Sequence, residues 1–368
     1  MYVLEDSLFG VKNLDLFLVI GILAFFIIIE VVAGHAKSTQ RKSGDWFLEL
    51  GSYLILALLI KPAIVLSVVF LSNQFIPNIN NLFSNQLFLV SLLLYLLVDD
   101  FLQYWYHRSA HEYAFLWKLH RPHHQAEEMG FFVSYRNAAL YYLIMPNLWW
   151  VGVFTFMGGA KAVALGLVLK QFIIISSHST ISYDKFLNKY TISKFFLSIW
   201  ERIFITPAFH HAHHGKSKID GISDPNGNFG NMFSIWDQLF GTAIFTRQFP
   251  KSYGLLNNPK EHWTAAYLYP LVKSNKPTSE LNPNFKKSDT SSLQAIDIKL
   301  EANKNYLWCR CGMSTNQPFC DGSHHGTKFK PELFQVKRTS TYKLCNCKAT
   351  KASPFCDDTH LKLEAREE

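Results

Sequence analysis

The chain contains 368 residues, of which 49% are hydrophobic, 15% aromatic and 17% charged. Soluble domains carry about 25% charged residues, so this composition excludes an ordinary soluble enzyme, and the apolar content excludes a disordered chain. The net charge of +8 fits basic loops on one side of a membrane, and nucleic acid is not an expected partner.

Five apolar stretches are each about long enough to cross a bilayer core of about 30 Å. They cover residues 14–33, 47–71, 86–105, 139–157 and 160–177. The second contains Lys61-Pro62, which predicts a break or two half-segments. The fourth and fifth predict a hairpin that turns near Gly158-Gly159, and Lys170 is expected merely to snorkel. The fold class is therefore mainly α, a polytopic helical bundle in a membrane.

The charges of the connecting loops predict the orientation. Residues 34–46 include Lys37, Arg41 and Lys42, whereas residues 72–85 include no charged side chain. The positive-inside rule then places 34–46, the end of the third stretch and everything after residue 178 in the cytoplasm. Residues 193–205 have the pattern of an interfacial helix. The acidic start is unlike a signal peptide, and the usage of Lys, Asn, Ile and Phe favours a bacterial inner membrane.

Histidine is concentrated in three clusters and one further position. These are His107-x-x-x-His111, His120-x-x-His123-His124, His210-x-x-His213-His214, and His178 at the end of the fifth apolar stretch. Spacings of three and four residues share one helix face, and the expected topology brings all of these histidines to one side of the membrane. A single cluster fits a surface patch equally well. The whole set favours metal ligation, and it exceeds what one tetrahedral metal needs, so two metals are predicted.

The motifs around these histidines resemble those of the fatty acid hydroxylase / sterol desaturase superfamily. The matching segments are His107-Arg108-x-x-His111, Leu116-Trp117-x-x-His120-x-x-His123-His124, Thr206-Pro207-x-x-His210-x-x-His213-His214, and residues 228–242. The resemblance covers roughly residues 85–245. It implies a membrane-embedded, non-haem di-iron oxygenase in which histidines hold both irons in a cytoplasmic cap. Members use O2 to hydroxylate or desaturate lipids, and the motifs leave both the reaction and the lipid open.

Other residues of this region are candidates for supporting roles. Asp100 precedes His107 by seven residues, about two helical turns, and is the candidate catalytic residue, as acceptor for a ligand N–H. The alternative is that it caps the membrane segment. Arg136 and Trp236 either shape the site or are structural. His211 fits no second spacing and is expected outside the metal ligands.

All six cysteines lie near the C-terminus, between Cys309 and Cys356, within an internal repeat. Eight residues recur 36 positions later in the same order. The first set is Cys309, Cys311, Ser314, Pro318, Phe319, Cys320, Asp321 and His324, and the second is Cys345, Cys347, Thr350, Pro354, Phe355, Cys356, Asp357 and His360. Cysteine and histidine at such spacings favour metal binding in a reducing compartment.

Each copy of the repeat resembles the CDGSH iron–sulfur domain. The resemblance implies one [2Fe–2S] cluster per copy, held by Cys309, Cys311, Cys320 and His324 in the first and by Cys345, Cys347, Cys356 and His360 in the second. The second copy departs from the pattern at Asp358, where glycine is usual. The alternative, a zinc ribbon, expects Cys-x-x-Cys knuckles instead.

Three parts and one function follow from these patterns. Residues 1–271 are expected to form the membrane di-iron domain, 272–293 a flexible linker, and 294–368 a small β-rich iron–sulfur domain with two copies of the motif. The expected activity is O2-dependent hydroxylation or desaturation of a lipid taken from the bilayer, with the clusters as electron donor and an unidentified reductase upstream. Two alternatives remain: the clusters act as a redox sensor, or the chain is a non-enzymatic iron- or cluster-handling protein. The oligomeric state is left open.

Overall fold

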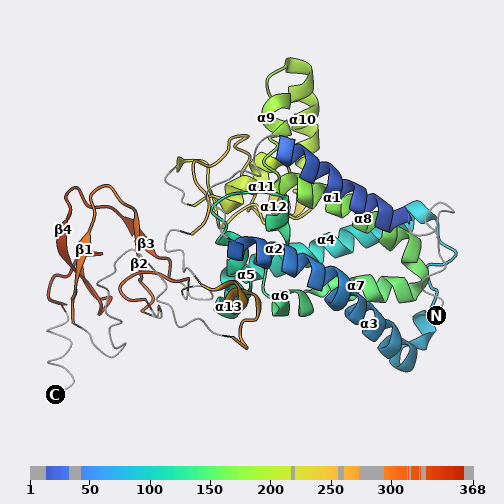
Figure 1. Cartoon of the computed structure of the whole chain (residues 1–368), viewed down its shortest axis with the longest axis horizontal. Coiled ribbons are helices and arrows are strands. Elements are labelled where there is room, and N and C mark those ends of the chain that lie inside the picture. Colours follow the sequence, from blue (N-terminus) through green and yellow to red (C-terminus); the bar gives the residue numbers. More distant parts are fainter. Residues whose placement is uncertain are drawn as a thin grey trace.

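The structure is a computed structural model that describes residues 14–32, 43–216, 220–255, 261–272, 294–312, 314, 316–322, 324 and 329–359. Figure 1 shows a helical part that contains the apolar stretches and, beside it, a smaller part made of short strands. The expected linker, apart from its first residue, and His360 lie outside the described residues.

The helical part begins with α1 (Leu14–Val32) and a long helix built from α2 (Ser43–Ile55), a π turn (Leu56–Ile60) and α3 (Lys61–Phe75). The expected break at Lys61-Pro62 does not occur, and the helix is continuous from Gly44 to Phe75. Proline lacks an N–H and its ring collides with the carbonyl four residues earlier. The π turn directly before it widens the hydrogen-bond ladder, which lets the helix continue.

The predicted hairpin is present. It consists of α7 (Pro146–Phe154) and α8 (Ala160–His178), joined by a π turn (Thr155–Gly159) in which Gly158 has a φ of 90°. Only glycine adopts such a φ without strain. Asn147 in α7 and Lys170 in α8 both contact Asp99 in α4 (Phe88–Glu112), so the two arms run back along each other beside α4.

Among the described residues, three helical stretches are long and apolar enough to cross a membrane: Gly44–Phe75, Phe88–Glu112 and Pro146–His178. They match the second, third and fifth expected stretches and the later part of the fourth, whose first residues form the separate helix α6 (Ala139–Leu143). The run Pro146–His178 includes both hairpin arms, which the turn at Gly158 divides. The first expected stretch corresponds to the shorter apolar helix Phe17–Val32. The third was expected to end near residue 105, but α4 continues to Glu112.

Shorter elements complete the helical part. They are α5 (Ala114–His124), α6 (Ala139–Leu143), α9 (Tyr183–Leu187), α10 (Thr191–Ile203), α11 (Pro207–His214), α12 (Ile235–Leu239), α13 (Trp263–Tyr267) and the 3-10 turns Pro77–Ile79 and Phe131–Tyr135. Helix α10 exposes Ile192, Phe195 and Phe196, which supports the prediction of a helix lying in the membrane interface.

The C-terminal part contains two antiparallel strand pairs. Strand β1 (Ile296–Leu300) pairs with β4 (Ser340–Leu344), and β2 (Tyr306–Trp308) pairs with β3 (Glu332–Phe334). Its core includes Leu300, Tyr306, Phe319 and Leu344. Because β1 precedes the first copy of the repeat and β4 leads into the second, the two copies share one small core.

The two copies of the repeat also share their backbone geometry. Cys309 N–H donates to the carbonyl of Pro318 over 2.8 Å, and Cys345 N–H donates to that of Pro354 over 2.9 Å. Gly322 has a φ of 92°, and Asp358 at the equivalent position has a φ of 60°. The departure from glycine in the second copy therefore leaves the loop in the same left-handed conformation.

Candidate metal centres

All nine histidines singled out in the sequence come together in two buried groups. The first contains His107, His111, His120, His124 and His213, and the second contains His123, His178, His210 and His214. Within each group, one ring nitrogen from every member lies within 4.8 Å of those of the others. Every side chain in both groups is at most 4% exposed.

Four helices bring these side chains together. Helices α4 and α5 supply most of the first group, whereas the C-terminal end of α8 supplies His178 to the second. Helix α11 contributes to both groups because consecutive residues such as His213 and His214 point to different sides. It begins with Pro207 after Thr206, whose hydroxyl accepts a hydrogen bond from Phe209 N–H, so the short helix is capped.

Backbone carbonyls fix which ring nitrogen carries the proton. The Nδ1–H of His107 donates to the carbonyl of Phe229 over 2.7 Å, and that of His213 donates to the carbonyl of Gly227 over 2.7 Å. The Nδ1–H groups of His123 and His178 donate to Val133 and Ile174 in the same way. Each Nε2 is then left with a lone pair that is directed into its group.

These lone pairs face one another at the separation expected between two ligands of one metal. The Nε2 atoms of His107 and His213 are 3.0 Å apart, and those of His123 and His178 are 3.4 Å apart. With Nδ1–H used in all four rings, no proton lies between the facing nitrogens, so they repel unless a cation sits between them. Two nitrogen ligands about 2.1 Å from one metal lie about 3 Å apart, and the groups fit this arrangement.

Burial keeps the imidazoles outside the membrane spans neutral. It lowers the pKa of His120, His123, His124, His213 and His214 well below the usual value, and the nearness of other histidines lowers it further in each case. Neutral imidazole is the form that binds metals. The Nε2 atoms of His120 and His124 are buried, with no hydrogen-bond partner among the described residues, as expected for nitrogens that face a metal.

His211 lies outside both groups, as the spacing predicted. Its Nε2–H donates to the carbonyl of Ser179 over 3.2 Å, and its Nδ1 accepts from the hydroxyl of Tyr253 over 2.8 Å. Both ring nitrogens are therefore engaged in hydrogen bonds, so this histidine supports the segment after α8.

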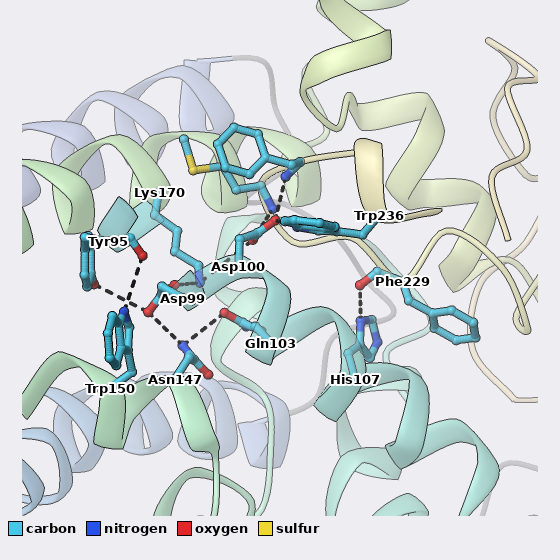
Figure 2. A network of polar contacts seen from close by, with 12 residues as sticks. Tyr95, Asp99, Asp100, Gln103, His107, Asn147, Trp150, Lys170, Phe229 and Trp236 are labelled. Carbon is cyan, nitrogen blue, oxygen red and sulfur yellow. Dashed lines mark hydrogen bonds and ion pairs between the residues drawn. The ribbon is translucent and has the colours of Figure 1, made fainter. Parts of the chain in front are cut away.

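The prediction for Asp100 needs correction. Its carboxylate accepts hydrogen bonds from the N–H groups of Met232 and Phe233, at 3.0 and 2.9 Å, and from the indole of Trp236 at 3.1 Å. None of these donors is a histidine (Figure 2). Asp100 is also 0% exposed in the middle of α4, so it does not cap the segment at the water boundary. It anchors the loop whose Phe229 carbonyl orients His107.

Arg136 and Asn137 hold the α5 histidines from the other side. Arg136 Nε donates to the carbonyl of Pro122 over 2.8 Å, and its guanidinium forms an ion pair with Asp45 at 2.6 Å. The amide oxygen of Asn137 accepts from Nδ1–H of His120 over 2.8 Å. Asn137 was missed by the sequence reading, because a lone asparagine in a loop carries no spacing signal.

A cavity of about 110 Å³ opens beside the histidines, between α4, α7 and α8. Its wall includes His107, His120, His123, His178 and His210, together with apolar residues such as Leu148, Val151 and Leu167. Asp99, Gln103, Asn147 and Lys170 form a polar strip on the same wall (Figure 2). Lys170, which was expected to snorkel, is 4% exposed and paired with Asp99.

The cysteines of the first copy form two pairs of donors. The Sγ atoms of Cys309 and Cys311 are 3.6 Å apart, and Cys320 Sγ is 3.1 Å from His324 Nδ1. Two ligands on one tetrahedral metal lie about 3.3–3.8 Å apart, so two pairs suit two metals rather than one. The second copy repeats the first pair, with Cys345 and Cys347 at 3.5 Å. The donors of the first copy therefore fit a binuclear cluster, while His360 of the second copy lies outside the described residues.

Lys348 lies between the two copies. Its ammonium donates to the carbonyl of Cys345 over 3.3 Å and stands 5.0 Å above the ring of Trp308. Burial lowers the pKa of Lys348, and the thiols of Cys309 and Cys345 act in the opposite direction because their thiolates attract the cation. One positive charge therefore faces the cysteines of both copies.

Comparison with known proteins agrees with both candidate metal sites, the histidine groups and the cysteine repeat. The fatty acid hydroxylase family model matches residues 92–242, and the model of the iron-binding zinc finger of CDGSH type matches residues 283–325. Alkylglycerol monooxygenase of Xenopus tropicalis is 28% identical over 148 residues, which are 39% of this chain and 28% of the relative. Ornithine lipid hydroxylase OlsE of Rhizobium tropici is 23% identical over 239 residues, 60% of this chain and 63% of the relative.

The C-terminal part has its own relatives. The mitochondrial CDGSH iron-sulfur domain-containing protein 3 of Mus musculus is 52% identical over 46 residues, 12% of this chain and 34% of the relative. The chain thus covers less than two thirds of the length of each of these proteins. It joins a fatty acid hydroxylase domain, at residues 92–242, to an iron-binding domain of the CDGSH type.

Proposed function

We propose that this protein is a membrane-bound di-iron oxidoreductase that uses O2 to hydroxylate or desaturate a lipid, with the CDGSH-type domain as its electron donor. The observation that carries the proposal is the pair of buried histidine groups, whose facing lone pairs border a cavity within the apolar helices. Two irons held there would supply an oxidant strong enough for an unactivated C–H bond, which acid–base side chains cannot break.

In the proposed site each iron has its own set of histidine ligands. His107, His111, His120, His124 and His213 would hold one iron, and His123, His178, His210 and His214 the other. The role of the surrounding chain is to orient these rings by their Nδ1–H hydrogen bonds and to keep bulk water away from them. Imidazole ligands suit iron, and the burial of all nine rings supports a site closed to the aqueous phase.

The cavity supports a substrate that enters from the bilayer. A cavity of about 110 Å³ has room for a short segment of a hydrocarbon chain beside the histidines. Its wall lies between apolar helices, so a hydrocarbon chain could reach the histidines without crossing water. The names of two relatives, a monooxygenase and a lipid hydroxylase, favour hydroxylation over desaturation.

The reaction defines the need for an electron donor. Hydroxylation of R–H by O2 consumes two electrons and two protons and yields R–OH and water. The two copies of the CDGSH-type motif would each carry one [2Fe–2S] cluster, held by three thiolates and one imidazole, and each cluster transfers one electron. An external reductase would reload them. We place the histidine groups and the C-terminal domain in the cytoplasm, which the basic loop 34–46 supports.

The test is O2 uptake by detergent-purified, iron-loaded protein with chemically reduced clusters and lipids of different classes. The proposal predicts uptake that depends on one lipid class and a product heavier by one oxygen atom, or lighter by two hydrogens if the reaction is desaturation. The variant His111→Ala should abolish the product and leave the cluster spectrum unchanged. No uptake with any lipid, in protein that retains all its iron, would contradict the proposal.

A further inference from the structure

The iron–sulfur domain meets the membrane domain at a contact between a glycine and an indole. A Cβ placed on Gly322 would lie 2.2 Å from Nε1 of Trp117 and 2.7 Å from its Cδ1. Real Cβ atoms do not approach other atoms so closely, so only glycine allows this loop to rest on the ring. Gly322 also has a φ of 92°.

Trp117 in turn lies against the first histidine group. Its ring is 5.2 Å from that of His111 and 5.6 Å from that of His124, measured between centroids. Gly322 lies in the loop between Cys320 and His324, the second donor pair of the first copy. One side chain therefore reaches from the iron–sulfur loop to two candidate iron ligands.

The two copies of the repeat differ in burial at this face. Asn316, Gln317 and Cys320 of the first copy are 2%, 4% and 5% exposed. In the second copy, Ala352 and Asp358 are exposed, and Cys356 is half-buried. Since the two copies share their backbone hydrogen bonds, the fold alone does not account for the difference. Gly322 of the first copy lies against Trp117, whereas the equivalent residue of the second copy, Asp358, is exposed.

We propose that the contact between Gly322 and Trp117 is the junction through which electrons pass from the first iron–sulfur copy to the histidine centre. This inference rests on the proposed function. In each transfer the first copy loses one electron and the histidine centre gains one, while no bond forms or breaks. The electron comes from an external one-electron reductant. Electron transfer slows steeply with distance, and the indole fills the gap between the loop and the histidines.

The second copy supplies a matched variant for the test. Asp358 shows that aspartate holds the left-handed conformation of this loop, so Gly322→Asp should keep its cluster while its Cβ collides with Trp117. The reciprocal variant, Asp358→Gly, changes the exposed copy and serves as the control. Both are compared with the wild-type full chain by iron and sulfide content, visible spectrum, hydrogen exchange and anaerobic stopped-flow after reduction of the clusters.

If this contact is the junction, the variant Gly322→Asp should lose both protection from hydrogen exchange and fast electron transfer. Residues 115–120 and 316–322 lose protection from hydrogen exchange, and cluster reoxidation by the histidine centre slows at least about tenfold, a barrier about 1.4 kcal/mol higher. The control keeps both properties. Wild-type protection and rate in Gly322→Asp with intact clusters would overturn the proposal.

A second pair of variants leaves the iron–sulfur loop untouched. Trp117→Leu should slow the transfer at equal iron content, and Trp117→Phe, which keeps an aromatic ring, should restore most of it. Transfer at the wild-type rate in Trp117→Leu would overturn the junction while leaving the donor role intact. No transfer in the wild-type chain would instead refute the donor role in the proposed function, and the junction with it.

Discussion

At the scale of single residues, the candidate metal centre is oriented by hydrogen bonds to the Nδ1 side of five of its imidazoles. The Nδ1–H of His107, His123, His178 and His213 donates to a backbone carbonyl, and that of His120 donates to the side chain of Asn137. Such bonds select the tautomer and hold the ring in its ligating direction. They are as much a part of the site as the nitrogens that face the metal.

Of these five acceptors, Asn137 is the side chain, and it gives a prediction. Asn137→Leu removes the acceptor for Nδ1–H of His120 at similar size, so we expect metal affinity to fall by about 10–100-fold. Asn137→Asp retains an acceptor and should stay closer to the wild type. Iron retained after dialysis against increasing chelator measures the difference. Equal retention by Asn137→Leu and the wild type would show that the hydrogen bond does not matter.

Asp100 gives a second prediction at this scale. Asp100→Ala leaves two buried backbone N–H groups and one indole N–H without their acceptor, and each such loss costs about 1–3 kcal/mol. We expect a clear drop in thermal stability and less iron, because the loop that orients His107 is released. Asp100→Asn keeps one acceptor oxygen and should be intermediate. An unchanged melting temperature and iron content in Asp100→Ala would refute the anchoring role.

At the scale of elements, helices α4 and α8 both line the cavity, and each does so with residues spaced four apart. Asp99, Gln103 and His107 follow one another on α4 at intervals of four residues, and Lys170, Ile174 and His178 do so on α8. Equal spacing puts the Asp99–Lys170 pair about 12 Å below the histidines, two turns down each helix. The pair therefore joins α4 to α8 at the level of the polar strip.

This pairing predicts non-additive effects. Lys170→Met leaves Asp99 buried without its cation and should destabilise the protein by about 3–5 kcal/mol. The double variant Asp99→Asn/Lys170→Met removes both charges of this pair and should recover part of that loss, because Asp100, 3.9 Å from the Lys170 ammonium, still loses its cation. Thermal unfolding in detergent of the two single variants and the double variant measures the coupling. Additive effects of the two substitutions would mean that the ion pair does not join these helices.

The sequence predicts the helices and the histidine clusters better than it predicts which side chains of different helices contact one another. The helical spacing of His107 and His111, and of His210 and His214, places their rings on shared faces, and the structure brings all nine histidines together in two groups. The hairpin at Gly158 was also predicted. The burial of Asp99 and Asp100 was not, because their partners Lys170 and Trp236 lie far along the chain and follow no period.

At the scale of the whole molecule, the two parts of the chain meet asymmetrically. The repeat predicted two equivalent copies, and their backbones are equivalent at Gly322 and Asp358. Their surroundings are not, since Gly322 of the first copy lies against Trp117, whereas Asp358 of the second copy is exposed. Contacts between domains depend on surface shape, and a single glycine that must fit an indole leaves no pattern in the sequence.

Lys348 gives a prediction for the iron–sulfur domain as a unit. A cation near a cluster stabilises its reduced, more negative form, so Lys348→Gln should make the reduction potentials of both copies more negative. Lys348→Arg keeps the charge and should stay near the wild type. Redox titration followed by the visible spectrum measures the shift. A shift of equal size in both variants would assign it to packing against Trp308 rather than to charge.

The most direct test of the account is the content of iron and acid-labile sulfide per chain in detergent-purified protein, together with its visible spectrum. Two [2Fe–2S] clusters and a di-iron centre predict about six irons and about four sulfides. About four irons and four sulfides, with zinc or no metal at the histidines, would leave the clusters in place and contradict the oxygenase.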